Sequence, residues 1–418
     1  MHMPPPAAEG SILEANPTVQ AELLRDALAP QRWPVPLESF PSGSALVGGA
    51  VRDALLGRLS STPDLDLVVP ADALGETRRL AQRYGGACVV LDEQRDMARL
   101  VVKGWTIDLA RQEGAELTAD LQRRDYRINA IALRLTPTPE LVDPCGGLQD
   151  LKAGLLTAVA EQNLIDDPLR LLRGIRIAAE LNFQIAADTW PLLNKHRKAL
   201  PKAAPERIQA ELTKLVQAPG ADRAMEQLRC SGLLAPWAPT ADADTNTPAE
   251  DLAKSAARLT PEERQAALPL VRLTELLSDH GLKALRFSRR QIQRCLVLRR
   301  WQQLDDGGGF SSLPEEQRLK LHTELGDDLP ALIIQLESPF QEAWLDRWRN
   351  PVDPLFHPQP PLDGTTLQHE LGITPGPQLG HLLQHLAVEQ AFGRLPNREA
   401  ALSAARQWWM ASQPPRCD

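Results

Sequence analysis

Two acidic residues, Asp64 and Asp66, stand one residue apart in the apolar and β-branched run Pro63-Asp-Leu-Asp-Leu-Val-Val69. Such a run predicts a strand, and the alternation of a strand turns both carboxylates to one face. Carboxylate oxygens are the ligands that Mg²⁺ prefers, so the pair is a candidate site for two metal ions. Taken alone, an Asp-x-Asp pair is more often a solvated strand edge.

A glycine pair precedes these acids in the run Ser44-Ala-Leu-Val-Gly-Gly-Ala-Val-Arg-Asp-Ala-Leu-Leu-Gly57. The apolar residues 45–47 predict a short strand, which meets Gly48 and Gly49 and then a helical pattern. Backbone N–H groups at such a turn can approach an anion, so the run predicts a phosphate cradle. By itself, a glycine pair before a helix is more often only a tight turn.

A third acid lies in the hairpin-like stretch 99–110, where Lys103 and Gly104 predict the turn. On the second strand of this hairpin, the apolar residues at 105, 107 and 109 share one face, so Asp108 points to the other. An acid on an open strand face is usually just solvated. From the residues alone, a role for Asp108 therefore stays open.

Basic and acidic side chains are packed closely in the stretch Asp120-Leu-Gln-Arg-Arg-Asp-Tyr-Arg-Ile-Asn-Ala130. Guanidinium groups are donors for a triphosphate, and a carboxylate can accept from a ribose hydroxyl. Arg124, Asp125 and Asn129 are therefore the candidates for binding sugar and phosphate. If the stretch stood alone, a surface ion-pair cluster would be the better interpretation.

In this order and spacing, the motifs resemble the signature of the polymerase-β-like nucleotidyltransferases. They resemble in particular the bacterial tRNA 3′-end nucleotidyltransferase and poly(A) polymerase family, which includes CCA-adding, CC-adding and A-adding enzymes. Asp108 matches the third carboxylate of that family, and residues 143–151 match its Asp-x-x-Gly-Gly-x-x-Asp-Leu motif. Arg127 departs from the family, which commonly has Thr there. The resemblance is strong over residues 45–216 and moderate over 361–405.

The segment Asp166-Asp-Pro-Leu-Arg170 opens a strongly helical pattern and resembles the family motif Glu-Asp-x-x-Arg, with a shorter first acid. A spacing of three residues predicts that Asp167 and Arg170 share one helix face. The carboxylate would accept from the exocyclic amine of C or A, and the guanidinium would donate to the adjacent ring nitrogen. U and G present the reverse order and would be rejected. An exposed ion pair is the alternative interpretation.

The resemblance implies that Asp64 and Asp66 bind two Mg²⁺ ions with Asp108 assisting, so that the three are the candidate catalytic residues. It implies template-independent addition of C, A or both to the 3′ end of tRNA from CTP and ATP, with release of pyrophosphate. The residues then expected to bind the nucleotide are Gly48, Gly49, Arg52, Asp53, Arg124, Asp125, Asn129, Asp167, Arg170 and Arg173.

Composition limits the class of protein. A formal net charge of -8 argues against a protein that coats nucleic acid indiscriminately. Five scattered cysteines suit a reducing compartment and imply no structural metal site. The start of the chain lacks the features of a signal peptide, and no apolar run approaches the length of a membrane span. We expect a cytoplasmic protein without membrane contact that is a monomer or a weak dimer.

The 418 residues predict several domains. We expect an α+β head with a small mixed sheet, resembling a polymerase-β palm, and then an elongated all-α body. The predicted strands include 64–69 and 128–135, and a Pro-rich link is predicted at 351–361. Residues 236–269 are predicted as an irregular link. The expected domains are a catalytic head at 1–142, a nucleotide-recognition neck at 143–235, an RNA-binding body at 236–350 and a tRNA-binding tail at 351–418.

Two basic clusters are candidates for contacts with the RNA backbone. The stretch Lys283–Arg300 contains no acid, and Lys195, Arg197, Lys198 and Lys202 form the second cluster. Solvated helix faces are an equally good interpretation of both. Three other functions stay open: a poly(A) polymerase acting on general RNA, a catalytically idle RNA-binding protein of the same fold, and a small-molecule nucleotidyltransferase. The last would leave the long helical body unexplained.

Overall fold

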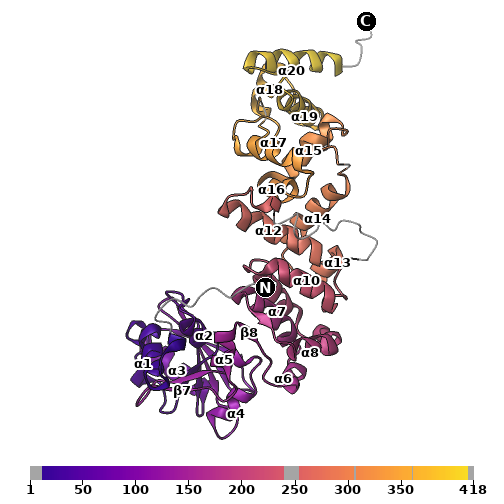
Figure 1. The fold of residues 1–418 in the computed structure, drawn as a ribbon. Coiled ribbons are helices and arrows are strands. Elements are labelled where there is room, and N and C mark those ends of the chain that lie inside the picture. Colours follow the sequence, from indigo (N-terminus) through magenta and orange to yellow (C-terminus); the bar gives the residue numbers. More distant parts are fainter. Residues whose placement is uncertain (1–11, 240–253, 306, 360, 413–418) are drawn as a thin grey trace. The chain divides into compact units, whose positions relative to one another are not determined.

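The computed structural model divides the chain into two compact units, Met1–Leu233 and Leu234–Asp418 (Figure 1). An α+β head opens the first unit and a mainly helical part follows, as the sequence predicts. The finer division into four domains stays a prediction. No helix of the described part is both long and apolar enough to cross a membrane. The described residues are 12–239, 254–305, 307–359 and 361–412.

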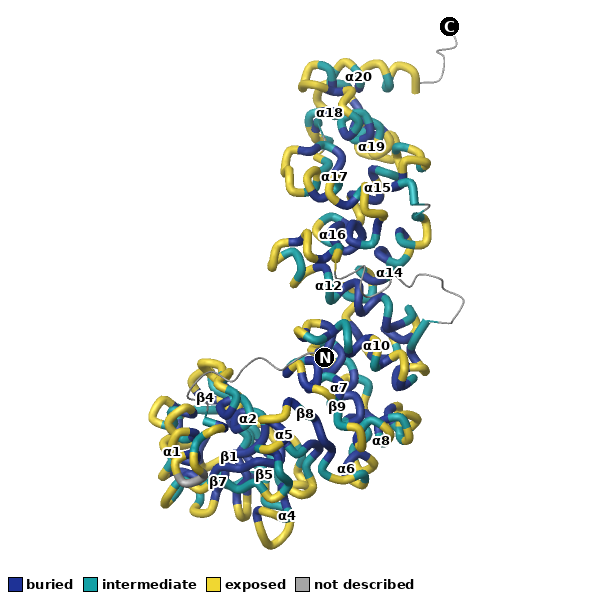
Figure 2. Tube along the Cα trace, viewed as in Figure 1, coloured by how far each residue is buried: buried dark blue, intermediate teal, exposed yellow. Residues whose placement is uncertain are grey.

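One seven-stranded sheet forms the centre of the head, in the order β3-β4-β5-β2-β1-β6-β7. β2 and β5 run parallel and the other neighbours run antiparallel, so the predicted mixed sheet is confirmed. Every residue of β1 and every residue of β2 except Asp66 is buried. Figure 2 colours buried residues dark blue along the trace. The strands are β1 Ala45–Val47, β2 Leu65–Val69, β3 Ala87–Asp92, β4 Met97–Val102, β5 Trp105–Arg111, β6 Ala132–Arg134 and β7 Glu140–Val142.

The strand predicted over 128–135 is shorter than expected. Residues Arg127–Asn129 form a 3-10 turn, η4, and only Ala132–Arg134 pair with β1. Ile128 and Ile131 are fully buried all the same, so their apolar character reports burial rather than strand pairing.

Four α-helices accompany the sheet of the head. α3 packs against β3, β4 and β5, and α2 packs against β1 and β2. α3 begins after Asp72, whose side chain accepts a hydrogen bond of 3.0 Å from the Gly75 amide and so caps the helix. The four helices are α1 Pro17–Leu28, α2 Gly49–Leu55, α3 Ala73–Tyr84 and α4 Leu117–Gln122.

The remainder of the first unit is helical, as predicted, except for a short parallel pair of strands, β8 Leu155–Leu156 and β9 Gln184–Ile185. The sequence pattern did not indicate this pair, because two residues are too few to show alternation. α7 packs against α9 and α10 and buries one apolar side. The helices are α5 Gly147–Ala153, α6 Glu161–Asp166, α7 Leu169–Leu181, α8 Thr189–His196, η5 Arg197–Lys202, α9 Pro205–Leu215 and α10 Ala221–Ser231.

The second unit consists of helices packed on one another. Its last part has an apolar core against which the partly buried Trp408 and Trp409 pack. The helices are α12 Pro261–Leu276, α13 Asp279–Ala284, α14 Arg289–Gln303, α15 Glu315–Leu325, η6 Gly326–Asp328, α16 Leu329–Ile333, α17 Ser338–Arg349, α18 Gly364–Leu371, α19 Pro377–Ala391 and α20 Arg398–Ser412.

Both predicted links are wrong in part. Thr260 and Glu263 form a reciprocal capping box that starts α12, so the predicted irregular segment ends before residue 261, while 240–253 lie outside the described residues. Pro269 lies inside that helix. In the Pro-rich stretch 351–361, Leu355 and Phe356 are buried and belong to the core.

Candidate active site

The three predicted carboxylates lie in or next to two neighbouring strands of the head. Asp66 lies on β2 and Asp108 lies directly beside it on the parallel strand β5. Residues in register on parallel neighbours share a face of the sheet, so both carboxylates point the same way. Asp64 precedes β2 by one residue, and its charge acts on Asp66. The register thus brings Asp66 and Asp108 side by side, and the sharing of metal ions by the three acids stays a prediction.

The carboxyl group of Asp66 is electrostatically unusual. Burial raises the pKa of Asp66 to about 6, against the opposing effect of Arg124 and with further contributions from Asp108 and Asp64. Desolvation and neighbouring negative charge both disfavour ionisation of a carboxyl group. Such an environment favours binding of a cation, which would remove the repulsion among the three acids.

The glycine turn lies against this carboxylate. Gly48 has φ 73°, and a β-carbon built at Gly48 would lie 3.2 Å from Asp66 Oδ2 and 3.6 Å from Arg124 Nη1. A side chain at position 48 would therefore be strained by its backbone conformation and would crowd the site. The turn, the metal-binding candidate Asp66 and a candidate phosphate ligand meet at one point.

A chain of hydrogen bonds links the glycine turn to the nucleotide-binding candidates. Arg52 forms a bidentate pair with Asp53, 3.0 Å at each bond, and Arg52 Nη1 donates to Asn129 Oδ1 at 2.8 Å. Asn129 Nδ2 in turn donates to Asp125 Oδ1 at 3.1 Å. Asp53 therefore orients Arg52.

Asp125 is buried and remains ionised. Burial by itself would raise the pKa of Asp125, but the Arg173 guanidinium, the Asn129 amide and Arg170 outweigh it, so that the pKa is lowered. Arg173 Nη1 lies 3.6 Å from Asp125 Oδ2, and Arg173 Nε donates to Glu211 Oε1 at 3.0 Å. The network thereby connects the head to α7 and α9.

Arg124 projects between the carboxylates and the helical part. Its Nη2 donates to Asp120 Oδ2 at 3.3 Å, and its buried Nε has no hydrogen-bond partner among the described residues. A buried donor without a partner is costly, so this group is well suited to an anionic ligand.

The prediction that Asp167 and Arg170 share a helix face is wrong. Asp167 has an extended backbone conformation between α6 and α7, whereas Arg170 lies in the first turn of α7. Asp167 instead accepts from Arg207 Nη2 at 2.8 Å, and Arg207 is a residue of α9. Arg170 Nη1 donates to the backbone carbonyls of Arg123 and Asn163. Proline at position 168 favours the extended conformation of its predecessor.

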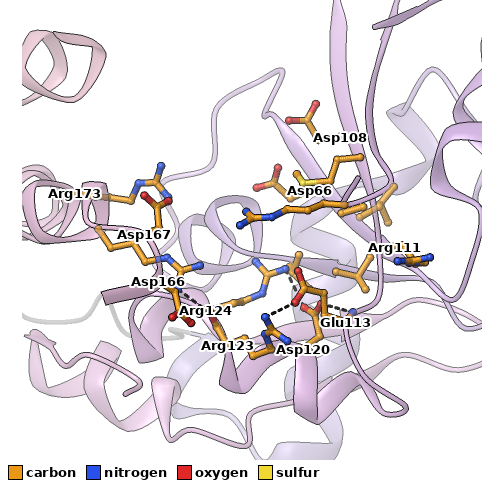
Figure 3. Close-up of a pocket in the computed structure, with 17 residues that line it drawn as sticks. Asp66, Asp108, Arg111, Glu113, Asp120, Arg123, Arg124, Asp166, Asp167 and Arg173 are labelled. Carbon is orange, nitrogen blue, oxygen red and sulfur yellow. Dashed lines mark hydrogen bonds and ion pairs between the residues drawn. The ribbon is translucent and has the colours of Figure 1, made fainter. Parts of the chain in front are cut away.

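Asp167 and Arg170 nevertheless line a cavity together with the catalytic candidates, and a second cavity adjoins it. A cavity of about 370 Å³ is lined by Asp66, Asp108, Asp167, Arg170 and Arg173, among other residues. Figure 3 shows Asp66 and Asp108 on one side of it and Asp167 and Arg173 on the other. The volume of this cavity falls within the range of small-molecule sites, about 300–1,000 Å³. A second cavity shares Asp66, Arg124 and Arg173 with the first. It is also lined by Gly48, Gly49, Arg52, Asp53, Asp64, Asp125 and Asn129.

Arg99 is the main residue of the site that the sequence interpretation missed. It forms a bidentate ion pair with Asp108, from Nε to Oδ1 at 2.8 Å and from Nη2 to Oδ2 at 2.9 Å. The hairpin register around the Lys103-Gly104 turn pairs residue 99 with residue 108, so counting outward from the turn would have found it.

The basic clusters are more fully paired than their sequences suggest. In α14, Arg294 pairs with Asp328, Arg299 with Asp279 and Arg300 with Glu324. Lys195 in the other cluster pairs with Glu161. Acids from distant segments therefore neutralise much of the apparent positive charge. Arg289 and Arg290 at the start of α14 are exposed and remain candidates for RNA contacts.

Comparison with known proteins shows the family. Residues 44–157 match the poly A polymerase head domain, and residues 182–245 match the probable RNA and SrmB-binding site of polymerase A. A CC-adding tRNA nucleotidyltransferase of Synechocystis sp. is 34% identical, over 90% of this chain and 96% of the relative. An A-adding tRNA nucleotidyltransferase of Deinococcus radiodurans is 43% identical, over 48% of this chain and 46% of the relative.

A solved structure agrees in fold. The Thermotoga maritima CCA-adding enzyme in complex with tRNA has a TM-score of 0.69 and 21% sequence identity, and the match covers 96% of this chain and 98% of that one. At this identity the likeness concerns the fold alone. Together with the full-length relative and the matched head domain, it leads to one assignment. The chain belongs to the tRNA nucleotidyltransferase and poly(A) polymerase family and is a nucleotidyltransferase.

Proposed function

We propose that this enzyme adds C residues to the 3′ end of tRNA, using CTP and releasing pyrophosphate, and that it stops before the terminal A. The observation that carries the polymerising activity is the register of Asp66 with Asp108 beside the Gly48 turn. CC-adding relatives are 32–34% identical over 86–90% of this chain, whereas CCA-adding relatives with similar coverage are 27–28% identical. The A-adding relatives match 40–48% of this chain.

A compact connection between β3 and β4 supports the same choice. These strands are joined by residues 93–96 alone, and Asp92 closes the turn by accepting from the amides of Gln94 and Arg95, each at 3.0 Å. A connection this short leaves little chain that could rearrange between C and A addition, which fits an enzyme that performs one half of CCA synthesis.

The acidic residues fit a divalent cation in their chemistry. Asp64, Asp66 and Asp108 offer only carboxylate oxygens, which hard cations such as Mg²⁺ prefer. Within the described part of the chain, no three Asp, Glu, His or Cys side chains are grouped as a metal site, and Asp108 is paired with Arg99. We propose two Mg²⁺ ions held by Asp64 and Asp66, with assistance from Asp108. When bound, Mg²⁺ would make the RNA 3′-hydroxyl a better nucleophile and neutralise the pyrophosphate.

The remaining residues of the site position the nucleotide. The Gly48-Gly49 turn, Arg52 and Arg124 hold the triphosphate, since they surround the same cavity as Asp64 and Asp66. Asp125 and Asn129 lie next in the hydrogen-bond chain and contact the ribose. Positioning and charge neutralisation account for most of the catalysis of phosphoryl transfer.

Base selection is assigned to Asp167 and Arg170, although they do not share a helix face. Both line the cavity that contains Asp66 and Asp108. Arg207 holds the Asp167 carboxylate, and Arg170 donates to two backbone carbonyls. An acceptor and a donor with fixed positions match the edge of C or A and leave U and G with unsatisfied groups. The protein, rather than a nucleic acid, serves as the template.

Primer extension on defined tRNAs tests the proposal. The protein is incubated with Mg²⁺, one labelled nucleoside triphosphate at a time, and tRNAs that end before CCA, after CC or after CCA. We expect two C residues on the first tRNA and no product from the second with ATP. Addition of A to the second tRNA would instead show an A-adding or CCA-adding enzyme.

Two further outcomes address the other functions. A long homopolymer on an unrelated RNA would identify a poly(A) polymerase. No incorporation on any acceptor, by a protein that still binds tRNA, would identify an idle RNA-binding protein. Asp64→Ala serves as the inactive control for the extension reaction.

A further inference from the structure

We infer that Arg99 withholds Asp108 from the cation site until the ion pair between these two residues opens. The guanidinium of Arg99 contacts both carboxylate oxygens, so Asp108 becomes a full ligand only when Arg99 releases at least one of them. Arg99 would thereby set how tightly the site binds a divalent cation in the absence of nucleotide. This inference rests on the cation site proposed above.

The ion pair is fixed by the sheet. Residues 99 and 108 are directly opposite on the antiparallel strands β4 and β5, and Asp108 is in register with Asp66 on the other side. Three adjacent strands therefore present a guanidinium and two carboxylates in a row on one face. Backbone pairing, rather than chance rotamers of two surface side chains, brings Arg99 to Asp108.

The geometry makes the pair stronger than an ordinary surface contact. Both bonds are short, 2.8 and 2.9 Å, and the Asp108 side chain is only 18% exposed. A bidentate arginine occupies one acceptor position on each carboxylate oxygen. A cation that approaches Asp108 meets a carboxylate with about half of its acceptor capacity in use and a positive charge bonded to its oxygens.

The acids of the site explain why such a counter-charge is useful. Asp64, Asp66 and Asp108 repel one another when no cation is present, and the charge of Arg99 also acts on Asp66. Arg99 offsets the repulsion at Asp108. The negatively charged triphosphate would then favour cation binding together with nucleotide over binding of the cation alone.

Mn²⁺ binding without nucleotide tests the inference apart from enzyme activity. Free Mn²⁺ is measured by electron paramagnetic resonance during titration of the full chain and of Arg99→Met, with Asp66→Asn to identify the site. We expect Arg99→Met to bind Mn²⁺ about tenfold more tightly, because a neighbouring positive charge and a competing ligand have been removed. In Asp66→Asn, Mn²⁺ binding at this site should be lost.

Two further variants separate the effect of occupying the Asp108 carboxylate oxygens from the effect of positive charge near the cation site. Arg99→Lys keeps the positive charge but cannot form the bidentate pair, so we expect a smaller tightening. Arg95→Met removes a positive charge that lines the same cavity as Asp108, where Arg95 Nε lies 3.9 Å from Asp92 Oδ2. It should leave Mn²⁺ affinity within about twofold of the original. Far-ultraviolet circular dichroism verifies that each variant is folded.

The outcomes distinguish this inference from the proposed function. If Mn²⁺ binds at a site that Asp66→Asn abolishes, and Arg99→Met binds it equally or more weakly, the role given to Arg99 is wrong while the cation site stands. If Arg99→Met and Arg95→Met tighten binding equally, general charge rather than the ion pair is responsible, and the inference is also overturned. Absence of binding in every variant would overturn both the cation site and the inference.

Discussion

The Tyr126 hydroxyl donates a hydrogen bond of 2.7 Å to the backbone carbonyl of Arg170, in the first turn of α7. Tyr126 is fully buried and belongs to the same stretch as Arg124 and Asp125. The helix that carries Arg170 and Arg173 is therefore seated directly on the segment that is proposed to bind sugar and phosphate. The fit is close, because a β-carbon at Gly174 would lie 1.9 Å from the Tyr126 hydroxyl oxygen.

We predict that Gly174→Ala destabilises the first unit although alanine is the better helix former. Overpacking destabilises by about 1–3 kcal/mol, whereas the higher helix propensity of alanine stabilises by about 1 kcal/mol. Urea unfolding followed by circular dichroism measures the change. Gly380→Ala in α19 is the matched control, because a β-carbon there meets nothing within 4 Å, and it should be neutral or slightly stabilising. Equal effects of the two substitutions would contradict the close packing of Tyr126.

We predict that Asp64→Ala and Asp66→Asn each lower the rate of C incorporation by at least about 100-fold. Cation contacts contribute several kcal/mol to the transition state of such reactions, and about 1.4 kcal/mol corresponds to tenfold in rate. Single-turnover extension of a tRNA lacking CCA measures the rate. Asp26→Asn, which alters an exposed ion pair with Arg25 on α1, should leave it unchanged. Activity retained by Asp66→Asn would remove the basis of the mechanism.

We predict that Asp167→Ala relaxes nucleotide choice. The ratio of C to U incorporation should fall by about tenfold or more, since an unsatisfied polar group costs about 1–3 kcal/mol. Arg207→Met should give a smaller loss, because it frees the carboxylate without removing it. Asp166→Ala is the matched control: Asp166 lines the same cavity but accepts from Gln162, and its loss should preserve selectivity. Unchanged selectivity in Asp167→Ala would refute its role in base selection.

We predict a pH-dependent loss of stability that originates in the second unit at His322. This side chain is 2% exposed and packs on the rings of Phe356 and Trp344, with centroid distances of 4.1 and 5.1 Å. Burial, assisted by Arg347, lowers the pKa of His322 to about 3 from 6.5. The folded state therefore stays neutral where the unfolded state takes up a proton.

The sign follows from proton linkage. The contribution of His322 is fully present above pH 6.5 and is lost as the pH falls from there toward about 3, by up to about 1.4 kcal/mol per pH unit. Urea unfolding at several pH values should show a shallower decline for His322→Leu than for the original chain. His369→Gln, which changes an exposed histidine, is the control and should retain the original slope. Parallel slopes in all three proteins would show that His322 does not cause the decline.

The sequence by itself predicted which residues of the head are candidates for the site, and in which strands they lie. Strand alternation turns Asp66 and Asp108 each away from the buried apolar residues that flank it in its strand. The short apolar run before Gly48 likewise predicts the strand that the turn follows. These inferences succeed because they depend on contacts or periodicities within a few residues.

Only the tertiary structure decided which groups pair across the chain. The partner of Asp167 is Arg207, forty residues away, and the acids that neutralise the basic helix α14 come from other helices. Chain folding brings such partners together, and no local periodicity encodes their approach. Arg99 is an intermediate case, since hairpin register places it opposite Asp108, but only the parallel pairing of β2 with β5 shows that Asp66 lies beside them.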